Sequence, residues 1–375
     1  MKLFEVYPLF DVEPVKAEGA FLFDGEGNKY LDFYGGHAVI SVGHGHPHFV
    51  DRITNQLGKL AFYSNSVPIK LQQEFASKLG ELSGYASWNL FLCNSGAEAN
   101  ENALKLASAH NGRKKVMAFT GGFHGRTSLA VAATDNPSIV FPVNEGAEIL
   151  RFDFEDFEAT ELALRNEDVC CVLIEGIQGV GGIVEPSTEF LLHLRRVCDD
   201  TGTFLILDEV QSGFGRSGRF FAHQHAHVTP DIISIAKGMG NGFPVGGIMI
   251  HPHLSPKIGM LGTTFGGNHL ACAAGLAVLE VIEQECLIQN ASQVGALLMD
   301  ELAEVSAIHQ IRGKGLMIGL EFDFPIAEMR KQLLYNHRVF TGSSSNKNTL
   351  RLLPPLTIGE KEVNQFIDAL KKVIS

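Results

Sequence analysis

Short runs of apolar residues alternate with glycine-rich or helix-like stretches between residues 89 and 250. Uninterrupted apolar runs of this length are typical of strands that are buried on both faces, because a strand with one solvated face alternates apolar and polar residues. The pattern therefore predicts an α/β fold in which helices cover a largely parallel sheet. The runs are NLFLC (89–93), KVMAF (115–119), VCCVLIE (169–175), TFLILD (203–208), DIISIA (231–236) and VGGIMI (245–250).

Helical spacing marks three longer segments. Between the third and fourth apolar runs, apolar residues recur three or four positions apart, and Gly202 follows as a stop signal. This segment predicts the helix of a βαβ crossover. A second helical pattern covers residues 275–304, and a last helix is expected near 359–374. The apolar positions of the first segment are Phe190, Leu191, Leu194, Val197 and Cys198.

The two ends of the chain are predicted to lie outside the sheet. Residues 21–33 (FLFDGEGNKYLDF) predict a hairpin, since aspartate and glycine supply the turn between two alternating runs. A break in composition at Gly262–Gly267 predicts the passage to a second, smaller domain. We therefore expect an N-terminal segment (1–45) that packs with the small domain, a large domain (46–262) and a C-terminal small domain (263–375).

Composition narrows the classes of function. Hydrophobic residues make up 45% and charged residues 19% of the 375 residues, which is typical of globular proteins. The net charge of -12 argues against nucleic acid as a partner, because that partner needs a basic surface. Glu5 and Pro8 interrupt the N-terminus where a secretory signal would be apolar, and no apolar run is long enough to span a membrane. We expect a cytoplasmic location and no membrane partner.

The cysteine and histidine patterns predict neither a redox site nor a metal site. The six cysteines form no CxxC pair, and several lie within apolar runs, so we expect reduced core residues. Histidines gather in GHGHPHF (43–49), AHQHAHV (222–228) and HPH (251–253), which look like metal sites. Proline or glycine breaks two of these stretches, and no carboxylate or cysteine accompanies them at a usual ligand spacing. We therefore expect no metal.

The segment NSGAEANENALKLA follows the first apolar run directly. Ser95 is placed to cap a helix, and Glu98 three residues later would complete a capping box. A helix that starts at the end of a strand presents free N–H groups and a positive dipole end, which suits a phosphate. An ordinary capped helix explains the same residues equally well.

The segment TGGFHGRT (120–127) follows the second run. Paired glycines hold Phe123 close to the backbone at the carboxyl end of a strand, where open α/β sheets bind ligands. A ring at that place could stack on an aromatic cofactor, and Arg126 could bind a carboxylate through its planar fork. Taken alone, a core phenylalanine and a surface arginine would be the preferred interpretation.

Two further strands end in ionisable residues. Asp208 ends the fourth run, where its carboxylate could face a protonated pyridine nitrogen or a helix N-terminus. Lys237 closes the fifth run and precedes several glycines, so it could be desolvated and lose its proton, as a lysine that attacks a carbonyl must. GMGNG (238–242) lacks the spacing of a nucleotide-binding loop. A phosphate seat, a ring, an acid and a lysine at one sheet edge together match pyridoxal phosphate.

Five motifs, in order along the chain, resemble the class III (ornithine-type) aminotransferases of fold type I, and the resemblance extends from about residue 10 to 365. It implies a large pyridoxal-phosphate-binding domain with a mainly parallel sheet sandwiched by helices, a smaller α+β domain, and a homodimer with shared active sites. The motifs are NSGAEANENALK, GGFHGRT, LDEVQSGFGRSG, IAKGMGNGFPVGG and TTFGGNHLACAAG.

The resemblance also implies roles for single residues. Lys237 would hold the cofactor and move the proton, and Asp208 would keep the pyridine nitrogen protonated. Arg126 would bind the distal α-carboxylate of the amino donor, Arg351 the carboxylate of glutamate or 2-oxoglutarate, and His37 would lie in the substrate pocket. The other implied cofactor contacts are Gln211 at the phenolic oxygen, Phe123 and Val210 on the ring, Ser95, Gly96 and Ala97 at the phosphate, and Thr264 at the phosphate of the neighbouring subunit.

The activity implied by the resemblance is transfer of the δ-amino group of an Nα-acylated ornithine to 2-oxoglutarate in arginine biosynthesis. The compact length and the SGAEANE segment look most like members that convert N-acetylornithine and 2-oxoglutarate into N-acetylglutamate 5-semialdehyde and glutamate, with N-succinylornithine as the next candidate donor. Free ornithine, 4-aminobutyrate, a lyase or racemase reaction, and a non-catalytic role remain alternatives. Tyrosine at position 37 would favour ornithine, and this chain has histidine there.

Four residues, in three segments, depart from the family pattern. EGIQGV has Gly176 and Val180 where the family has proline and glutamate, His37 replaces the tyrosine of ornithine enzymes, and His269 replaces a proline. In relatives the glutamate pairs with the arginine that matches Arg351. Without it, either another acid such as Glu185 reaches Arg351 or Arg351 stays solvated, and we expect the second.

Overall fold

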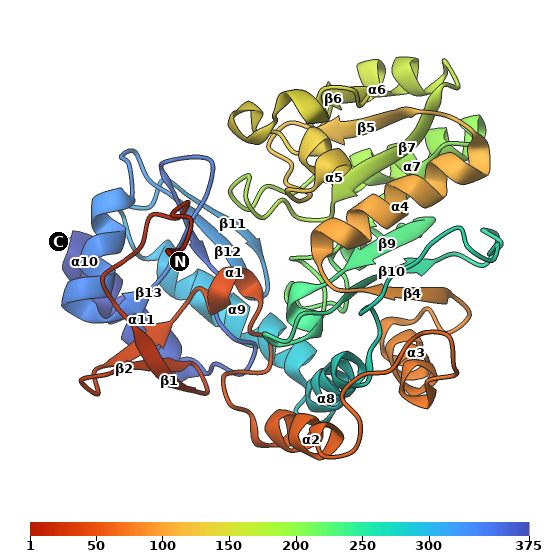
Figure 1. Ribbon diagram of the computed structural model, residues 1–375. Helices are drawn as coiled ribbons and strands as arrows, with labels where there is room; N and C mark the ends of the chain where they lie inside the picture. Colours follow the sequence, from red (N-terminus) through yellow and green to blue (C-terminus); the bar gives the residue numbers. More distant parts are fainter. Residues whose placement is uncertain (375) are drawn as a thin grey trace.

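A seven-stranded sheet organises the larger part of the chain in the computed structural model, which describes residues 1–374 (Figure 1). The six predicted runs all form strands of this sheet, and a short seventh strand, β6, joins at its edge. Neighbours are parallel except at β10, which is antiparallel to both β4 and β9. The order is β4 (Asn89–Cys93), β10 (Gly246–Ile250), β9 (Ile232–Ile235), β8 (Phe204–Asp208), β7 (Val169–Glu175), β5 (Lys115–Phe119) and β6 (Ile149–Phe152).

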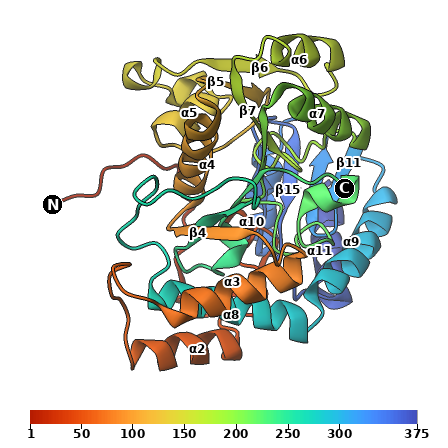
Figure 2. The same cartoon turned by 90° about the vertical axis from the view of Figure 1, so that its right-hand side faces the viewer.

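Helices cover both faces of this sheet. Alternate residues of β5 point to opposite sides, so that Val116 packs in the cluster with helix α4 and Met117 in the cluster with helix α7. Helix α7 is the predicted crossover helix, and it ends at Gly202 in the left-handed conformation. In both views α2, α3 and α8 gather at the β4 end of the sheet (Figure 1, Figure 2). The helices are α2 (Pro47–Leu57), α3 (Lys70–Ser83), α4 (Gly96–Asn111), α5 (Ser128–Ala133), α6 (Phe157–Leu164), α7 (Thr188–Thr201) and α8 (His269–Gln284).

The pattern at 275–304, predicted as one helix, forms two. Helix α8 ends at Gln284, and α9 starts at Leu287. Between them Cys286 has a φ of 52°, a left-handed conformation that interrupts the ladder of helical hydrogen bonds. Both helices keep an apolar face, so sequence periodicity alone does not reveal the break.

A second, antiparallel sheet lies in the C-terminal part, with the strand order β11-β12-β15-β14. The predicted hairpin is present as β2 and β3, and β3 pairs with β13 from the C-terminal part. The two ends of the chain therefore share a sheet. These elements are β1 (Pro14–Glu18), β2 (Phe21–Asp24), β3 (Lys29–Asp32), α9 (Leu287–Ala303), β11 (Gln310–Lys314), β12 (Met317–Glu321), α10 (Ala327–His337), β13 (Val339–Phe340), β14 (Gly342–Ser343), β15 (Thr349–Leu352) and α11 (Glu360–Ile374).

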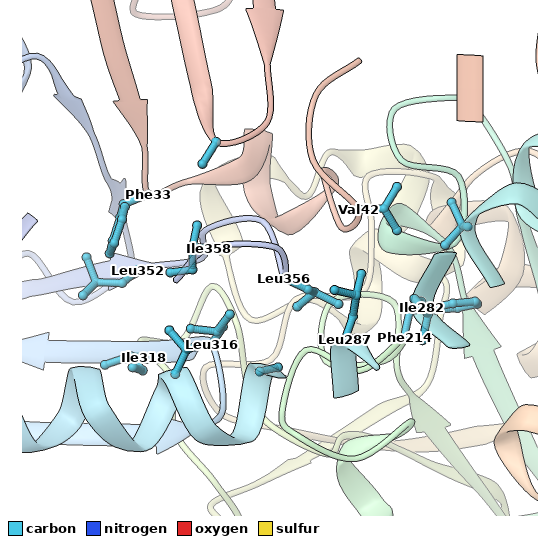
Figure 3. Packing of buried hydrophobic residues seen from close by; sticks show 14 of the residues in the cluster. Phe33, Val42, Phe214, Ile282, Leu287, Leu316, Ile318, Leu352, Leu356 and Ile358 are labelled. Atoms are coloured by element: carbon cyan, nitrogen blue, oxygen red, sulfur yellow. The ribbon is translucent and has the colours of Figure 1, made fainter. Parts of the chain in front are cut away.

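A continuous apolar core joins these parts (Figure 3). It brings Phe33 from the N-terminal segment against Leu352 and Ile358 near the C-terminus, and it includes Phe214 and Ile282 beside the large sheet. This packing holds residues 34–39 and strand β15 next to the carboxyl edge of the large sheet. The remaining short helices are α1 (Gly35–Ala38), η1 (Pro137–Ile139), η2 (Pro142–Asn144), η3 (Ala222–Ala226) and η4 (Lys237–Met239).

No helix within residues 1–374 is long and apolar enough to cross a membrane. In the same range, no three histidine, cysteine or acidic side chains come together as a metal site. Several of the histidines hydrogen-bond to neighbouring side chains, as His44 does to Asp32 and His46 to Glu285. Five cysteines are buried free thiols, and Cys286 is exposed.

Candidate active site

A cavity of about 360 Å³ lies at the carboxyl edge of the large sheet, where the segments that contain Ser95, Phe123, Asp208 and Lys237 meet. Nine of the twelve predicted site residues line it, while His37, Thr264 and Arg351 lie outside its wall. Parallel strands end at one edge, so residues far apart in sequence converge there. The nine are Ser95, Gly96, Ala97, Phe123, Arg126, Asp208, Val210, Gln211 and Lys237.

The N-terminus of α4 forms one wall of the cavity. Ser95 caps the helix by accepting a hydrogen bond from the Glu98 backbone N–H at 3.2 Å. The predicted capping box is only half present, because the Glu98 carboxylate accepts from the backbone and side chain of Asn94 instead of closing on Ser95. A Cβ added to Gly96 would lie 2.6 Å from the Val210 side chain, so only glycine lets the helix start this close to Val210.

Three donors hold the carboxylate of Asp208, which is 3% exposed. Its Oδ2 accepts from Asn100 Nδ2 and from His124 Nδ1, each at 2.8 Å, and its Oδ1 accepts from the backbone N–H of Val210 at 3.1 Å. Three donors on one buried carboxylate fix its orientation. Asp208 therefore presents its carboxylate at the cavity in a fixed position.

Asn100 and His124 are site residues that our sequence reasoning did not single out. A signal for Asn100 was available, since it is a polar residue on the buried face of α4, beside Ala99 and Ala103. A buried polar side chain needs a partner. The identity of that partner, Asp208, becomes visible only in the folded chain.

Lys237 follows β9 and begins the short helix η4 with a φ of 47°. Its side chain lines the cavity, and desolvation by burial lowers its pKa, while the charges of Asp208 and Glu175 oppose that shift. A lysine whose pKa is lowered loses its proton more readily and becomes a nucleophile. The left-handed backbone at a non-glycine residue is strained, as is common at functional sites.

Glu175, at the end of β7, is a further buried acid that our sequence reasoning missed. It accepts hydrogen bonds from the backbone N–H groups of Phe123 and Gly179, each at 2.9 Å. Burial raises its pKa to about 7, against the opposing charge of His124. Glu175 thereby ties the Phe123 turn to the loop that follows β7.

Arg126 is exposed at the cavity and forms no ion pair within residues 1–374, so its guanidinium is available to an anion. Thr264 is also exposed but lies outside the cavity, in the loop beside β4. Its neighbour Thr263 is the residue that accepts a hydrogen bond from Asn94, at 3.4 Å.

Arg351 is 3% exposed, so the expectation that it stays solvated is wrong. It donates to the backbone oxygen of Ser343 and to the side-chain oxygen of Gln211. Glu185 does not reach it, because the Glu185 carboxylate pairs with Lys314. Burial lowers the pKa of Arg351, in part against the charges of Tyr34 and Glu175. Neutral oxygens therefore hold this cation.

Gln211 links Arg351 to the N-terminal segment, because its Nε2 donates to the backbone oxygen of His37 at 3.2 Å. His37 has a φ of 69°, and its ring lies against Tyr34, whose hydroxyl is 3.0 Å from Nε2. Desolvation, followed by the charge of Arg351, lowers the pKa of His37 to about 4. The imidazole is therefore neutral at pH 7.

These groups match the chemistry of pyridoxal phosphate. The glycine start of α4 provides a cradle that a Cβ would fill, with backbone donors suited to a phosphate. The Asp208 carboxylate suits a protonated pyridine nitrogen, and Lys237 suits a carbonyl. A carboxylate at Arg126 would lie at the same cavity.

Comparisons with known proteins agree with this chemistry. A sequence profile described as "Aminotransferase class-III" matches residues 5–374. The acetylornithine aminotransferase of Bacillus subtilis is 39% identical over 100% of this chain and 97% of its own length. That of Archaeoglobus fulgidus is 39% identical over 95% of this chain and 93% of its own.

Solved structures show the same architecture. The ornithine aminotransferase of Toxoplasma gondii superposes with a TM-score of 0.91, at 28% identity over 98% of this chain and 91% of that one. The acetylornithine aminotransferase of Elizabethkingia anophelis superposes with a TM-score of 0.86, at 31% identity over 98% of this chain and 95% of that one.

Proposed function

This chain belongs to the class III aminotransferases, a family of pyridoxal-phosphate enzymes, and on that premise we propose that it transfers the δ-amino group of an Nα-acylated ornithine to 2-oxoglutarate. N-acetylornithine is the first donor to consider, because the relatives from B. subtilis and A. fulgidus are named for it. The products would be N-acetylglutamate 5-semialdehyde and glutamate, a step of arginine biosynthesis. Histidine in place of tyrosine at position 37 supports an acylated donor over free ornithine.

The observation that carries the proposal is the pairing of Asp208, held by three donors, with Lys237, whose pKa is lowered, in one cavity. Bound pyridoxal phosphate supplies an electron sink for the electrons of a C–H bond. Ser95, Gly96 and Ala97 would hold its phosphate, Phe123 and Val210 would contact its ring, and Gln211 would reach its phenolic oxygen.

The chain's own groups would then divide the proton transfers and the binding. Asp208 would keep a proton on the ring nitrogen, and Asn100 and His124 hold its carboxylate in place for that role. Lys237 Nζ moves a proton to and from the reacting carbon. Arg126 orients the α-carboxylate of the acylated donor, and Arg351 orients the carboxylate of the keto acid.

The assembly proposed with this function is a cytoplasmic homodimer, in which Thr264 contributes to the phosphate site of the partner subunit. Exposure of Thr264 outside its own cavity supports that assignment. The proposed division of the chain is residues 1–45, 46–262 and 263 onward. Pairing of β3 with β13 supports placing the first segment with the small domain.

The deciding experiment is absorption spectroscopy of the yellow holoenzyme during addition of single amine donors. N-acetylornithine is expected to bleach the visible band, and 2-oxoglutarate is expected to restore it. N-succinylornithine, ornithine and 4-aminobutyrate serve as competing donors. If ornithine or 4-aminobutyrate reacts and neither acylornithine does, the proposed substrate class is wrong.

A further inference from the structure

The turn that carries Lys237 has a strained backbone. Lys237 and Asn241 have φ values of 47° and 46°, although neither residue is a glycine. Left-handed conformations at non-glycine residues persist only where surrounding contacts hold them in place. Two such residues in one short turn therefore need contacts from outside the turn.

Residues 41–43 of the N-terminal segment supply these contacts. The Asn241 side chain is buried, and its Oδ1 accepts hydrogen bonds from the backbone N–H groups of Ser41 at 2.8 Å and Val42 at 3.0 Å. Its Nδ2 donates to the backbone oxygen of Gly43 at 2.9 Å. One side chain of the turn is therefore bound to consecutive residues of a segment that is far away in the sequence.

Ser41 makes a second connection to the same turn. Its Oγ donates to the backbone oxygen of Gly238 at 2.7 Å, and Gly238 is the residue after Lys237. Ser41 is itself held by the C-terminal part, because its backbone oxygen accepts from the backbone N–H of Leu356 at 2.8 Å. Val42 and Leu356 both belong to the continuous apolar core (Figure 3). The turn is therefore anchored to the packed core of the protein.

The hydrogen bonds of Ser41 and Asn241, which we call the turn clamp, lie directly beside the cavity. Val39, Lys237 and Gly242 line the cavity, and each is within two residues of a position that the turn clamp bonds. The direction of the Lys237 side chain therefore depends on a backbone that the turn clamp holds. A misplacement of about 1 Å in a reacting group can cost about a hundredfold in rate.

We propose that Asn241 and Ser41 are positioning residues that keep the Lys237 amine directed at the reacting atoms. The inference rests on the proposed function for the role of Lys237, but it does not depend on which amine donor is used. A simpler explanation gives Asn241 only the left-handed backbone, which asparagine tolerates better than most residues. The two explanations differ in the effect that they predict for glycine at position 241.

The test is Asn241→Gly, because glycine keeps the left-handed backbone without strain and removes only the side-chain hydrogen bonds. With N-acetylornithine and 2-oxoglutarate, we expect kcat to fall about tenfold. The KM values should stay unchanged, because Arg126 and Arg351 are not part of the turn clamp. Asn241→Asp keeps an acceptor for the N–H groups of Ser41 and Val42 and should recover part of the loss.

Asn111→Gly is the matched control, since Asn111 also bonds to backbone groups and lies at the other end of α4 from the cavity. Its Nδ2 donates to the backbone oxygens of Cys170 at 2.9 Å and Gly202 at 3.4 Å, and its Oδ1 accepts from the backbone N–H of Arg113 at 3.2 Å. This variant should lower the melting temperature and leave kcat unchanged. It therefore measures the effect of a general loss of stability.

Ser41→Ala is a milder variant that removes only the hydrogen bond to Gly238, and its kcat should fall about threefold. It keeps the test decisive if Asn241→Gly does not fold, because wild-type kcat in Ser41→Ala then overturns the proposal. If Asn241→Gly folds, the proposal is overturned when this variant loses no more kcat than Asn111→Gly does. In that case Asn241 supplies only the backbone conformation.

A measurement without an amine donor separates this inference from the proposed function. Pyridoxal phosphate is added to the full-length protein after removal of cofactor, so that the Lys237 amine can bond to the aldehyde carbon with loss of water. Borohydride then reduces the product, and peptide mass spectrometry locates it. Attachment at Lys237 should be about tenfold slower in Asn241→Gly than in the wild type and unchanged in Asn111→Gly.

The two measurements can fail independently. If the wild-type enzyme reacts with neither acylornithine, the proposed substrate class is wrong, but attachment of pyridoxal phosphate still tests the turn clamp. Equal rates of attachment in Asn241→Gly, Asn111→Gly and the wild type overturn the positioning role. Attachment of the wild type at a lysine other than Lys237 overturns it as well.

Discussion

The side-chain amide of Asn100 donates to the carboxylate of Asp208 at 2.8 Å and to the backbone oxygen of His124 at 2.7 Å. One side chain on α4 thus connects the acid at the end of β8 with the turn that carries Phe123. Its own oxygen is buried without a partner in the described chain. The two acceptors of its amide group therefore orient Asn100, and we expect this side chain to position Asp208.

Replacement of Asn100 by alanine should lower kcat about ten- to hundredfold, since a hydrogen bond to a charged group is worth about 1.5–3 kcal/mol. The KM for the amino donor should change little, because Asn100 does not touch Arg126 or Arg351. Asn102→Ala is the matched control, since Asn102 lies on the same helix and donates only to the backbone oxygen of Glu98. Steady-state kinetics at saturating cofactor measure both variants, and equal kcat in the two would refute the positioning role.

Lys237→Ala should abolish turnover and leave the protein folded, because the group that holds the cofactor and the group that moves the proton are the same amine. Lys105→Ala, an exposed lysine on α4, serves as the control and should keep full activity. The check is single-turnover absorbance together with circular dichroism. Near wild-type transamination by Lys237→Ala would show that another residue performs both tasks.

Asp208→Asn should still bind cofactor but lose most of kcat, since a neutral amide cannot hold the ring nitrogen protonated. The motivating feature is a buried carboxylate fixed by Asn100, His124 and the Val210 backbone. We expect a fall of several hundredfold or more, about 3–4 kcal/mol in activation free energy. Turnover at saturating cofactor measures this, and an unaltered kcat contradicts the assigned role.

Arg126→Lys should raise KM for the acylated donor much more than for 2-oxoglutarate. A planar fork is replaced by a point charge at the exposed edge of the cavity, while Arg351 remains in place. Initial rates with each substrate varied in turn give the two KM values. If both rise by the same factor, the two arginines do not divide the substrates as proposed.

Val180→Glu should weaken 2-oxoglutarate binding and spare the acylornithine half-reaction. The backbone oxygen of Val180 accepts from Ser345, two residues beyond the Ser343 oxygen that binds Arg351, so a carboxylate introduced here would lie near that cation. Val180→Gln has a similar volume without the charge and is the control. Separate half-reactions decide the matter: equal 2-oxoglutarate kinetics in the two variants mean that the charge at position 180 has no influence.

The main features of the large sheet could be predicted from the sequence. A strand that is buried on both faces consists of apolar residues, because neither face contacts water. VCCVLIE is buried along its whole length as β7, and the other five runs also form strands. Ser95, Asp208 and Lys237 could be placed at one edge of the sheet, because each follows or ends a strand and the carboxyl ends of parallel strands lie at the same edge. The half-exposed strand β6, ILRF, has no such pattern and was not predicted.

Other features depended on contacts between residues that are distant in the sequence. Such contacts cannot be predicted from the local spacing of apolar residues. The break at Cys286 needs a left-handed residue that the apolar pattern does not record, and the burial of Arg351 depends on Ser343 and Gln211 meeting it across the fold. The partners of Asp208 come from α4 and from the turn after β5. The sequence by itself determined which residues had to be at the sheet edge. Only the tertiary structure decided which of them touch, because hydrogen bonds act over about 3 Å and depend on the relative positions of separate elements.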